Sequence, residues 1–592
     1  MMNAPSASLY SRALSRGRGR GALPVAAAFL FLLALSFAQI PPVWTSGVFG
    51  DTDDAMRMVQ VRDLIAGQSW FDLTQRRMAP PEGAPMHWTR AVDAPLAVFF
   101  RLFALGLEPP RAEAAARLLY SGLLLILLLV ACARFARTLM GARGRAPVLV
   151  SFALSGAVFG QFIWGRVDHH GLQLALLILL LDAALRALDP QRPRAAAVTA
   201  CVGVISLCVS AENAPLVAAA FAIAPLRWMI DGHGRSALGY CACGLGVALP
   251  LAALVFIPAG AQAARACDAF SYAYLFAGVC GGAVLATLWA MAPRLRAASA
   301  RALTLVFAGA LAVLCVALLF PDCLRHPYGA IDPLVRELWL GNMPEARSFA
   351  ALWREDPIDA LALAAPLAFA AGGIALAVMR AQGLARLRWI ALAGVGLVAC
   401  ALVALEVRSF WQALFTLAWG ASYAALRAAR RWRAPWLAFA LVIAASPMFW
   451  ALGKSLMQKT AAAQTSAACY APESFGALAR LAPGRVLAPI NLGAHVLAHT
   501  HHDVLGGAYH RLSQANRNLI EMFLAAPDEA RALLARAGVR YVAICFDAHT
   551  LSAFTRRAPQ GLAATLAHDD ARVDWLRKIS IKDAPVGVYD VR

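Results

Sequence analysis

The sequence predicts an all-α polytopic membrane protein of about 13 transmembrane helices, followed by an extracytoplasmic α/β domain. Three observations lead to this fold class. The 592 residues are 60% hydrophobic and only 15% charged, and their mean hydropathy is +0.61. Apolar runs of roughly 18–22 residues, long enough to cross a bilayer, recur along the chain. Near residue 463 these runs end, and amphipathic helical stretches alternate with short strand-like runs.

Arginine clusters between the apolar runs set the expected orientation. The net charge is +20, but most of the arginine is distributed as in the cytoplasmic loops of multi-pass proteins, which argues against a nucleic-acid-binding surface. The basic N-terminus resembles a signal peptide but lacks a clear cleavage site, so we interpret 22–40 as an uncleaved first span. The expected spans are 22–40, 114–132, 147–164, 171–187, 196–211, 214–229, 238–259, 271–292, 303–320, 358–379, 389–405, 411–426 and 435–452.

These spans divide the chain into two domains. Residues 1–462 form the membrane domain, with outer loops 41–113 and 321–357, and residues 463–592 form a soluble domain. Within the first loop, the short run 94–107 contains Arg101 and is interpreted as an interfacial or re-entrant helix. Because every expected inner connection carries arginine, we expect a multi-pass protein of the cell inner (cytoplasmic) membrane with a periplasmic C-terminal domain.

The soluble domain has recognisable helix and strand patterns. Amphipathic helical stretches cover 474–481 and 516–537, and strand-like runs cover 486–490, 539–546 and 586–591. A His-rich segment, 495–510, is interpreted as a polar loop, with metal binding as the alternative.

The cysteines carry no metal-binding pattern. None of the twelve forms a Cys-x-x-Cys pair, and many lie inside apolar runs, where buried thiols are expected. Cys267, Cys323, Cys469 and Cys545 fall in segments expected outside, where disulfides can form, although the sequence predicts no pairing.

An acidic segment follows the first span. Asp51, Asp53 and Asp54 place three carboxylates within four residues at the expected outer membrane edge. Acidic residues at a bilayer edge favour a metal or cation site. The same residues also fit a solvated loop with a cap for a helix that starts near Ala55. This segment alone leaves both interpretations open.

Further polar residues are expected on the same face, where other spans end. Asp168, His169 and His170 follow one span, Glu212 and Arg408 follow two others, and Glu345 lies in the outer loop 321–357. Carboxylates combined with imidazole suit Mn²⁺ or Mg²⁺. The alternatives are a helix cap with two interfacial imidazoles for Asp168–His170, a buried helix-end residue for Glu212 and a solvated charge for Glu345.

Taken in order, these motifs resemble the catalytic subunit of oligosaccharyltransferases, which are lipid-linked-oligosaccharide transferases of the GT-C class. The likeness covers nearly the whole chain in outline. The segments that carry it are Asp51-Thr52-Asp53-Asp54-Ala55-Met56-Arg57, 80–93 with its Pro-Pro and Trp, Gly165-Arg166-Val167-Asp168-His169-His170, Met343-Pro344-Glu345 and Val407-Arg408-Ser409-Phe410.

The resemblance implies roles for individual residues. Asp53 or Asp54 would ligate Mn²⁺ or Mg²⁺ together with Asp168 and His170, and the two aspartates would act with Glu345 at the catalytic centre. Arg408 would bind the phosphate of a polyprenyl-linked donor. Secondary candidates for the same site are Asp51, Arg57, His169 and Glu212.

The sequence also departs from that family. Its Trp-Trp-Asp-Tyr-Gly acceptor motif is absent from the C-terminal domain, and the nearest counterpart is Asn491-Leu492-Gly493-Ala494-His495. The acceptor therefore stays open between a glycan, a lipid and a protein.

The leading functional hypothesis is a membrane glycosyltransferase that moves a sugar or oligosaccharide from a polyprenyl-phosphate or -pyrophosphate donor on the outer face, assisted by a metal. The alternative is a transporter or flippase of a lipid-linked glycan, although transporter sites usually lie near the bilayer midplane. A third is a membrane scaffold with a degenerate site.

Overall fold

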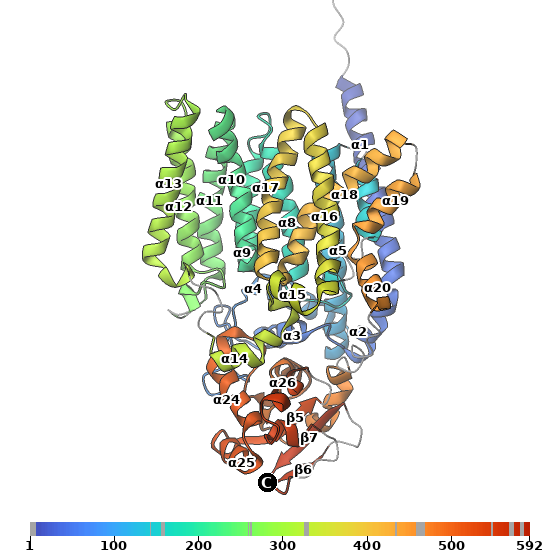
Figure 1. Ribbon diagram of the computed structural model, residues 1–592, viewed down its shortest axis with the longest axis vertical. Coiled ribbons are helices and arrows are strands. Elements are labelled where there is room, and N and C mark those ends of the chain that lie inside the picture. The colour runs from blue at the N-terminus through green and yellow to red at the C-terminus, as the bar shows by residue number, and fades with distance from the viewer. Residues whose placement is uncertain are drawn as a thin grey trace, which may run out of the picture.

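In the computed structural model, a tall bundle of helices stands on a smaller α/β unit (Figure 1). We call residues 468–592 the C-terminal unit. The structure describes residues 7–141, 144–154, 160–258, 260, 263–324, 331–432, 435–457, 468–545, 549–567, 573–579 and 585–592. The expected domain boundary at 462/463 lies outside these residues.

The bundle is built from long apolar helices joined by short connections. They are α1 (Ala7–Ser36), α2 (Ile40–Ser46), α5 (Pro109–Met140), α6 (Arg145–Leu154), α8 (His170–Ala187), α9 (Ala195–Val209), α10 (Ala214–Asp231), α11 (Arg235–Phe256), α12 (Tyr272–Met291), α13 (Ala298–Leu319), α16 (Pro357–Arg380), α17 (Gly383–Leu405), α18 (Phe410–Trp432), α19 (Pro435–Ala444) and α20 (Pro447–Met457).

In the described part of the chain, nine helices are long and apolar enough to cross a membrane. The count of about thirteen is not confirmed. Of the other four expected spans, α9 is a shorter apolar helix, and 435–452 is a helix pair bent by 69° between α19 and α20. The span 147–164 includes residues 155–159, which lie outside the described residues. The last, α18, has arginines along its final turns and does not pass the same apolarity test.

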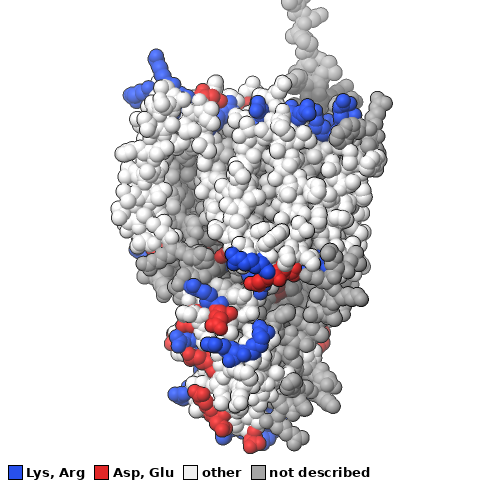
Figure 2. Space-filling model, viewed as in Figure 1, with Lys and Arg blue, Asp and Glu red and all other residues white. Residues whose placement is uncertain are grey.

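The surface of the bundle fits a multi-pass membrane protein. Figure 2 shows mostly Lys and Arg, with some Asp or Glu, at the end remote from the C-terminal unit, charges of both signs where the two parts meet, and a largely uncharged belt between them. In α13, none of the most apolar window is buried. Such a belt is the surface that a lipid environment requires.

The centre of the bundle is packed by aromatic side chains from α5, α6 and α18. The ring of Phe135 lies 4.6 Å from that of Trp419, and Phe152 contacts the same indole at 5.1 Å. All three side chains are buried. Close aromatic contacts of this kind hold helices at a fixed spacing, which gives the helix ends a rigid base.

Short elements fill the space between the bundle and the C-terminal unit (Figure 1). They are α3 (Thr52–Ile65), the strands β1 (Thr74–Gln75) and β2 (Ala84–Pro85), α4 (Arg90–Phe103), α14 (Pro333–Leu338) and α15 (Phe349–Glu355). The helix expected at 94–107 corresponds to α4, which buries Val92, Asp93 and Leu96 and exposes Val98 and Leu102. This two-sided pattern suits a helix that lies along a boundary.

The C-terminal unit is a five-stranded sheet with helices. The strand order is β4-β3-β5-β7-β6. β3 pairs in parallel with β4 and β5, whereas β7 pairs antiparallel with β5 and β6. The elements are α22 (Gly476–Ala479), β3 (Arg485–Leu487), α23 (Gly493–His499), β4 (Asp503–Val504), α24 (Ser513–Leu524), α25 (Pro527–Arg536), β5 (Val539–Cys545), α26 (His549–Arg557), α27 (Leu562–Thr565), β6 (Leu576–Lys578) and β7 (Val586–Val591).

Several local details differ from the sequence expectation, among them a helix break and two disulfides. The helical stretch 516–537 is broken into α24 and α25, because Pro527 starts a new helix and cannot donate to the preceding turn. Disulfides join Cys267 to Cys323 and Cys469 to Cys545. The first ties the α11–α12 connection to the segment after α13, and the second anchors the start of the C-terminal unit to β5.

Candidate active site

The acidic segment forms the start of α3. Asp51 is the N-cap of this helix, and its Oδ1 accepts a hydrogen bond of 2.9 Å from the backbone N–H of Asp54. A capped helix and a cation site, the two alternatives for this segment, therefore involve the same carboxylate. Its Oδ2 accepts a second bond, of 2.7 Å, from Arg166. The cap turns Asp54 inward, where it is fully buried.

The second acidic motif reaches Asp54 through its backbone. Oδ1 of Asp54 accepts the N–H groups of Val167 and Asp168 at 2.6 and 2.9 Å. Asp168 accepts Nε of Arg166 at 2.7 Å on one oxygen and the backbone N–H of His170 at 3.0 Å on the other. These bonds bring residues more than a hundred positions apart into one small polar site.

A glycine and a buried arginine fix this geometry. Gly165 has φ +81°, a left-handed conformation that other residues rarely adopt, and a Cβ there would lie 2.7 Å from Val43. Arg117 of α5 donates to the carbonyls of Gly165, Gly47 and Val48 at 3.2, 3.0 and 2.5 Å. One guanidinium therefore holds the backbone that precedes both acidic motifs.

Asp51, Asp54 and Asp168 make up what we call the carboxylate group. One oxygen from each lies within 4.8 Å of the others. Oδ2 of Asp54 is buried and has no hydrogen-bond partner among the described residues. A Cβ on Gly50 would lie 2.7 Å from this atom, so only glycine leaves the space beside it open.

The group is electrostatically uneven. Burial, together with Asp51 and Asp168, raises the pKa of Asp54 well above its usual range. Burial would also raise the pKa of Asp168, but the Arg166 guanidinium and the nearby imidazoles hold it below its usual value. Asp168 therefore favours its ionised form, whereas the surroundings of Asp54 favour its neutral form.

A second cluster lies beside the first. His169, His170 and Glu212 make up the imidazole group, in which Glu212 Oε1 lies 3.8 Å from His169 Nε2 and Oε2 lies 3.6 Å from His170 Nδ1. Arg408, in the turn Val407–Ser409, places Nη1 3.9 Å from Glu212 and Nε 2.7 Å from Glu406. Burial and the charge of His170 lower the pKa of His169, so that imidazole is neutral at pH 7.

Asp53 and Glu345 complete the candidate set from two other directions. Burial raises the pKa of Asp53 to about 8, and Asp51, Asp168 and Glu345 contribute in the same direction. Glu345 itself is exposed, in the turn Pro344–Ala346. The loop that carries it is tied to the Arg408 turn by a hydrogen bond of 2.9 Å from Val407 N–H to the Arg347 carbonyl.

The structure distributes the predicted residues over two neighbouring groups. Asp54 and Asp168 come together as expected, Asp51 joins them, and His170 lies with His169 and Glu212 instead. Asp53 is near enough to be affected by Asp168 and His170. Arg57 has a different place: it is buried, donates to Asp93 at 2.8 Å and lies 4.3 Å above the Trp88 ring.

The prediction of a polar loop at 495–510 is wrong for much of this segment. Gly493–His499 forms α23, and His495 and His499 are packed with Phe49 and Phe475. The two imidazoles are packed in an aromatic core. Histidine in a sequence does not show whether its ring is buried or solvated.

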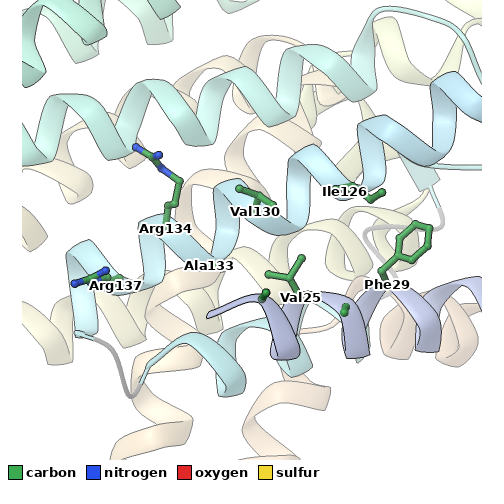
Figure 3. Close-up of a pocket in the computed structure, with 9 residues that line it drawn as sticks. Val25, Phe29, Ile126, Val130, Ala133, Arg134 and Arg137 are labelled. Carbon is green, nitrogen blue, oxygen red and sulfur yellow. The ribbon is translucent and has the colours of Figure 1, made fainter. Parts of the chain in front are cut away.

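A groove in the bundle lies elsewhere. It runs between α1 and α5, has a volume of about 460 Å³, and contains none of the candidate site residues. Figure 3 shows Val25, Phe29, Ile126 and Val130 along it and Arg134 and Arg137 toward one end. We therefore do not assign it to the active site.

Two residues that matter here were not among the sequence candidates. Arg166 stood within the quoted motif, and a cation two residues from an aspartate is a usable signal for a charge partner. Arg117 had no local signal, since it is one arginine at the start of a long apolar helix and its three acceptors are distant in sequence.

Several solved structures have a fold similar to that of this chain, among them structures of archaeal oligosaccharyltransferase. The Archaeoglobus fulgidus oligosaccharyltransferase, tethered to an acceptor peptide with an NVT sequon, aligns with a TM-score of 0.69 at 13% identity, covering 92% of this chain and 72% of that one. The archaeal oligosaccharyltransferase AglB from the same organism, in complex with an inhibitory peptide and a dolichol-phosphate, aligns with a TM-score of 0.67 at 13% identity, covering 93% and 72%.

A third structure of the A. fulgidus enzyme, in complex with Zn and sulfate, aligns with a TM-score of 0.65 at 13% identity over 91% and 70% of the two chains. No family model matches the chain, and no match was found among curated proteins.

The chain thus has the fold of the archaeal oligosaccharyltransferase, as its motifs predicted. At 13% identity this likeness establishes the fold alone.

Proposed function

We propose that the protein is a GT-C-type, oligosaccharyltransferase-like glycosyltransferase that transfers a sugar or oligosaccharide from a polyprenyl-phosphate or -pyrophosphate donor. One observation carries this proposal: the carboxylate group and the imidazole group, the latter with Arg408 beside its Glu212, lie at helix ends in an oligosaccharyltransferase fold. The solved relative binds a dolichol-phosphate, which supports a lipid-linked donor here.

The carboxylate group fits a divalent cation. One oxygen from each residue lies within 4.8 Å of the others, and Asp54 also has a buried Oδ2 without a hydrogen-bond partner in the described chain. An all-oxygen donor set favours Mg²⁺ or Mn²⁺ over a soft metal. We propose Asp51, Asp54 and Asp168 as ligands, with Asp53 and His170 at the edge of the site. Such a cation neutralises charge on a phosphate leaving group.

The residues of this chain then have separable tasks. Arg408, held beside Glu212 and Glu406, binds the donor phosphate by charge-assisted hydrogen bonds. Arg166 fixes the rotamer of Asp168 and balances its charge against Asp51. Glu345 approaches Asp53 from an exposed loop, where it accepts a proton from the acceptor or orients it.

The placement of these groups favours transfer over transport. They lie in loops and first turns at the bundle end that faces the C-terminal unit, whereas transporter sites lie near the bilayer midplane. If the arginine-rich end of the bundle lies in the cytoplasm, the opposite end, with the candidate site and the C-terminal unit, faces the periplasm. We propose an inner-membrane location on that basis.

The test is a transfer assay with the purified protein and a polyprenyl-linked sugar extract. Wild-type activity is expected to require Mg²⁺ or Mn²⁺ and to fall at least about 100-fold in Asp168→Asn and in Glu345→Gln. Arg408→Gln is expected chiefly to raise the KM for the donor. Glu473→Gln, an exposed carboxylate of the C-terminal unit, serves as the control. Full activity in Asp168→Asn, or activity that survives chelation, contradicts the proposal.

A further inference from the structure

A third cluster of metal-binding side chains lies where three distant segments meet. His87 comes from the first outer loop, Asp268 from the connection between α11 and α12, and His510 from the C-terminal unit. One ligand atom of each lies within 4.8 Å of the others. We call these residues the junction cluster. None of them has a role in the transfer proposed above.

The local contacts show a site held in shape from outside. Asp268 Oδ2 is 2.5 Å from His510 Nε2, and Arg511 donates Nε and Nη2 to the two carboxylate oxygens at 2.8 and 2.5 Å. Arg511 also donates Nη1 to the carbonyls of Pro85 and Met86 at 3.3 and 3.0 Å. It thereby fixes both the carboxylate and the backbone that precedes His87.

His87 supplies the second imidazole. Its ring lies 5.1 Å from that of His510, and its Nδ1 is buried and has no hydrogen-bond partner among the described residues. A buried imidazole nitrogen without a partner is costly, and a metal ion is one way to satisfy it.

We propose that His87, Asp268 and His510 bind a zinc ion that clamps the C-terminal unit onto the end of the helical bundle. Two imidazoles with one carboxylate form a donor set typical of zinc, with water as the fourth ligand. A carboxylate offers about four lone-pair positions. Arg511 occupies two lone-pair positions of the Asp268 carboxylate, and zinc would take the position that now faces His510. Arg511 would then orient the carboxylate ligand without contacting the metal.

The cluster is accessible to ions and well anchored. The side chains of His510 and Asp268 are each 19% exposed, which gives a route from solvent. Asp268 follows Cys267, whose disulfide to Cys323 fixes this connection. Trp88 separates the cluster from the imidazole group, with its ring 5.2 Å from His87 and 5.8 Å from His169. The clamp therefore sits beside the candidate active site without sharing its ligands.

Metal content of the purified full chain tests this directly. After equilibration with buffered zinc and gel filtration, wild type is expected to retain about one zinc per chain more than His510→Gln. Asp168→Asn, which alters the carboxylate group, should keep the junction zinc. His501→Gln changes an exposed histidine of the same unit and is the control. Equal zinc in wild type and His510→Gln overturns the proposal.

Cobalt distinguishes a metal site from a plain ion pair. Co²⁺ in a four-coordinate His₂Asp site should give strong visible absorption in wild type and Asp168→Asn and none in His510→Gln. His510→Cys should restore binding and add a thiolate-to-cobalt band in the near ultraviolet, which guards against a simple folding defect. The proposal fails if two results are found together. His510→Gln lowers the stability of the C-terminal unit equally with and without zinc, and wild type gives no cobalt spectrum. The cluster is then an ion-pair contact.

Discussion

At the scale of single residues, the space beside Asp54 decides what the carboxylate group can hold. Asp54 Oδ2 has no hydrogen-bond partner among the described residues, and a Cβ on Gly50 would lie 2.7 Å from it. The proposed metal ion would satisfy this buried oxygen.

We expect Gly50→Ala to lower the affinity for Mg²⁺ or Mn²⁺ about tenfold, because the new Cβ would press on Asp54 Oδ2. Isothermal titration with the metal measures this. Gly106→Ala adds the same methyl group where nothing lies within 4 Å and should bind metal as wild type does. Unchanged affinity in both variants would remove Asp54 from the ligand set.

Arg117 is the other residue on which the geometry depends. Arg117→Lys keeps the charge but loses the forked donor that reaches three carbonyls, at a cost of about 3 kcal/mol. We expect a lower thermal unfolding midpoint in detergent and a weaker metal site. Arg137→Lys, at an exposed position of the same helix, should change neither. If Arg137→Lys were as damaging as Arg117→Lys, the effect would belong to the helix and not to the site.

Only some of these residues could be predicted from the sequence. Asp54 and Asp168 were predictable because acidic residues are rare in so apolar a chain and stand out at the span ends. Arg117 and Gly50 were not, because their importance comes from contacts across the fold.

At the scale of elements, α23 couples the first outer loop to the C-terminal unit. Arg62 donates to the carbonyl of Ala498, and Arg77 donates to those of Leu497 and Thr500, so two arginines cap the end of this helix. Cations at a helix C-terminus are favourable because they face its unsatisfied carbonyls.

A buried histidine in the same helix should make the stability of the protein sensitive to acid. Burial and His499 lower the pKa of His495 to about 3, from an ordinary value of 6.5. The unfolded chain therefore binds a proton between pH 6.5 and 3 that the folded chain does not. The free energy of unfolding is at its full value above pH 6.5 and falls as pH decreases, by up to about 1.4 kcal/mol per pH unit for this group.

We expect His495→Phe, which keeps an aromatic ring but cannot bind a proton, to reduce the loss of stability between pH 7.5 and 5. Denaturant unfolding followed by fluorescence at several pH values measures the slope. His501→Gln, at an exposed position, should retain the wild-type slope. Identical slopes in His495→Phe and wild type would mean that another group causes the acid sensitivity.

Sequence reasoning located most elements but not their breaks. β7 matches the predicted run 586–591, and β5 differs from 539–546 at its last residue, which lies outside the described residues. The bent pair α19 and α20 was predicted as one span, since apolarity alone does not show a bend of 69°. α23 was missed because its histidines read as polar although they are packed in a core.

At the scale of the whole molecule, the loop that carries Glu345 rests on the C-terminal unit. α14, before Glu345 in the chain, packs Val335 and Leu338 against that unit, and Trp339 donates to Asn491 Oδ1 at 3.2 Å. The carbonyl of Asn491 accepts Thr52 Oγ1 of α3 at 3.3 Å. The C-terminal unit therefore contacts both the loop that carries Glu345 and the helix that carries Asp53 and Asp54, an arrangement that span counting does not reveal.

The most direct measurement uses wild-type protein in proteoliposomes with a polyprenyl-linked sugar extract and a divalent metal. Product analysis by mass spectrometry follows the sugar. The account predicts a new glycosidic bond on an acceptor and release of the polyprenyl phosphate carrier, both dependent on the metal. If the lipid-linked glycan instead crosses the vesicle membrane with no new glycosidic bond, the protein is a transporter, and the assignment of a transfer site is wrong.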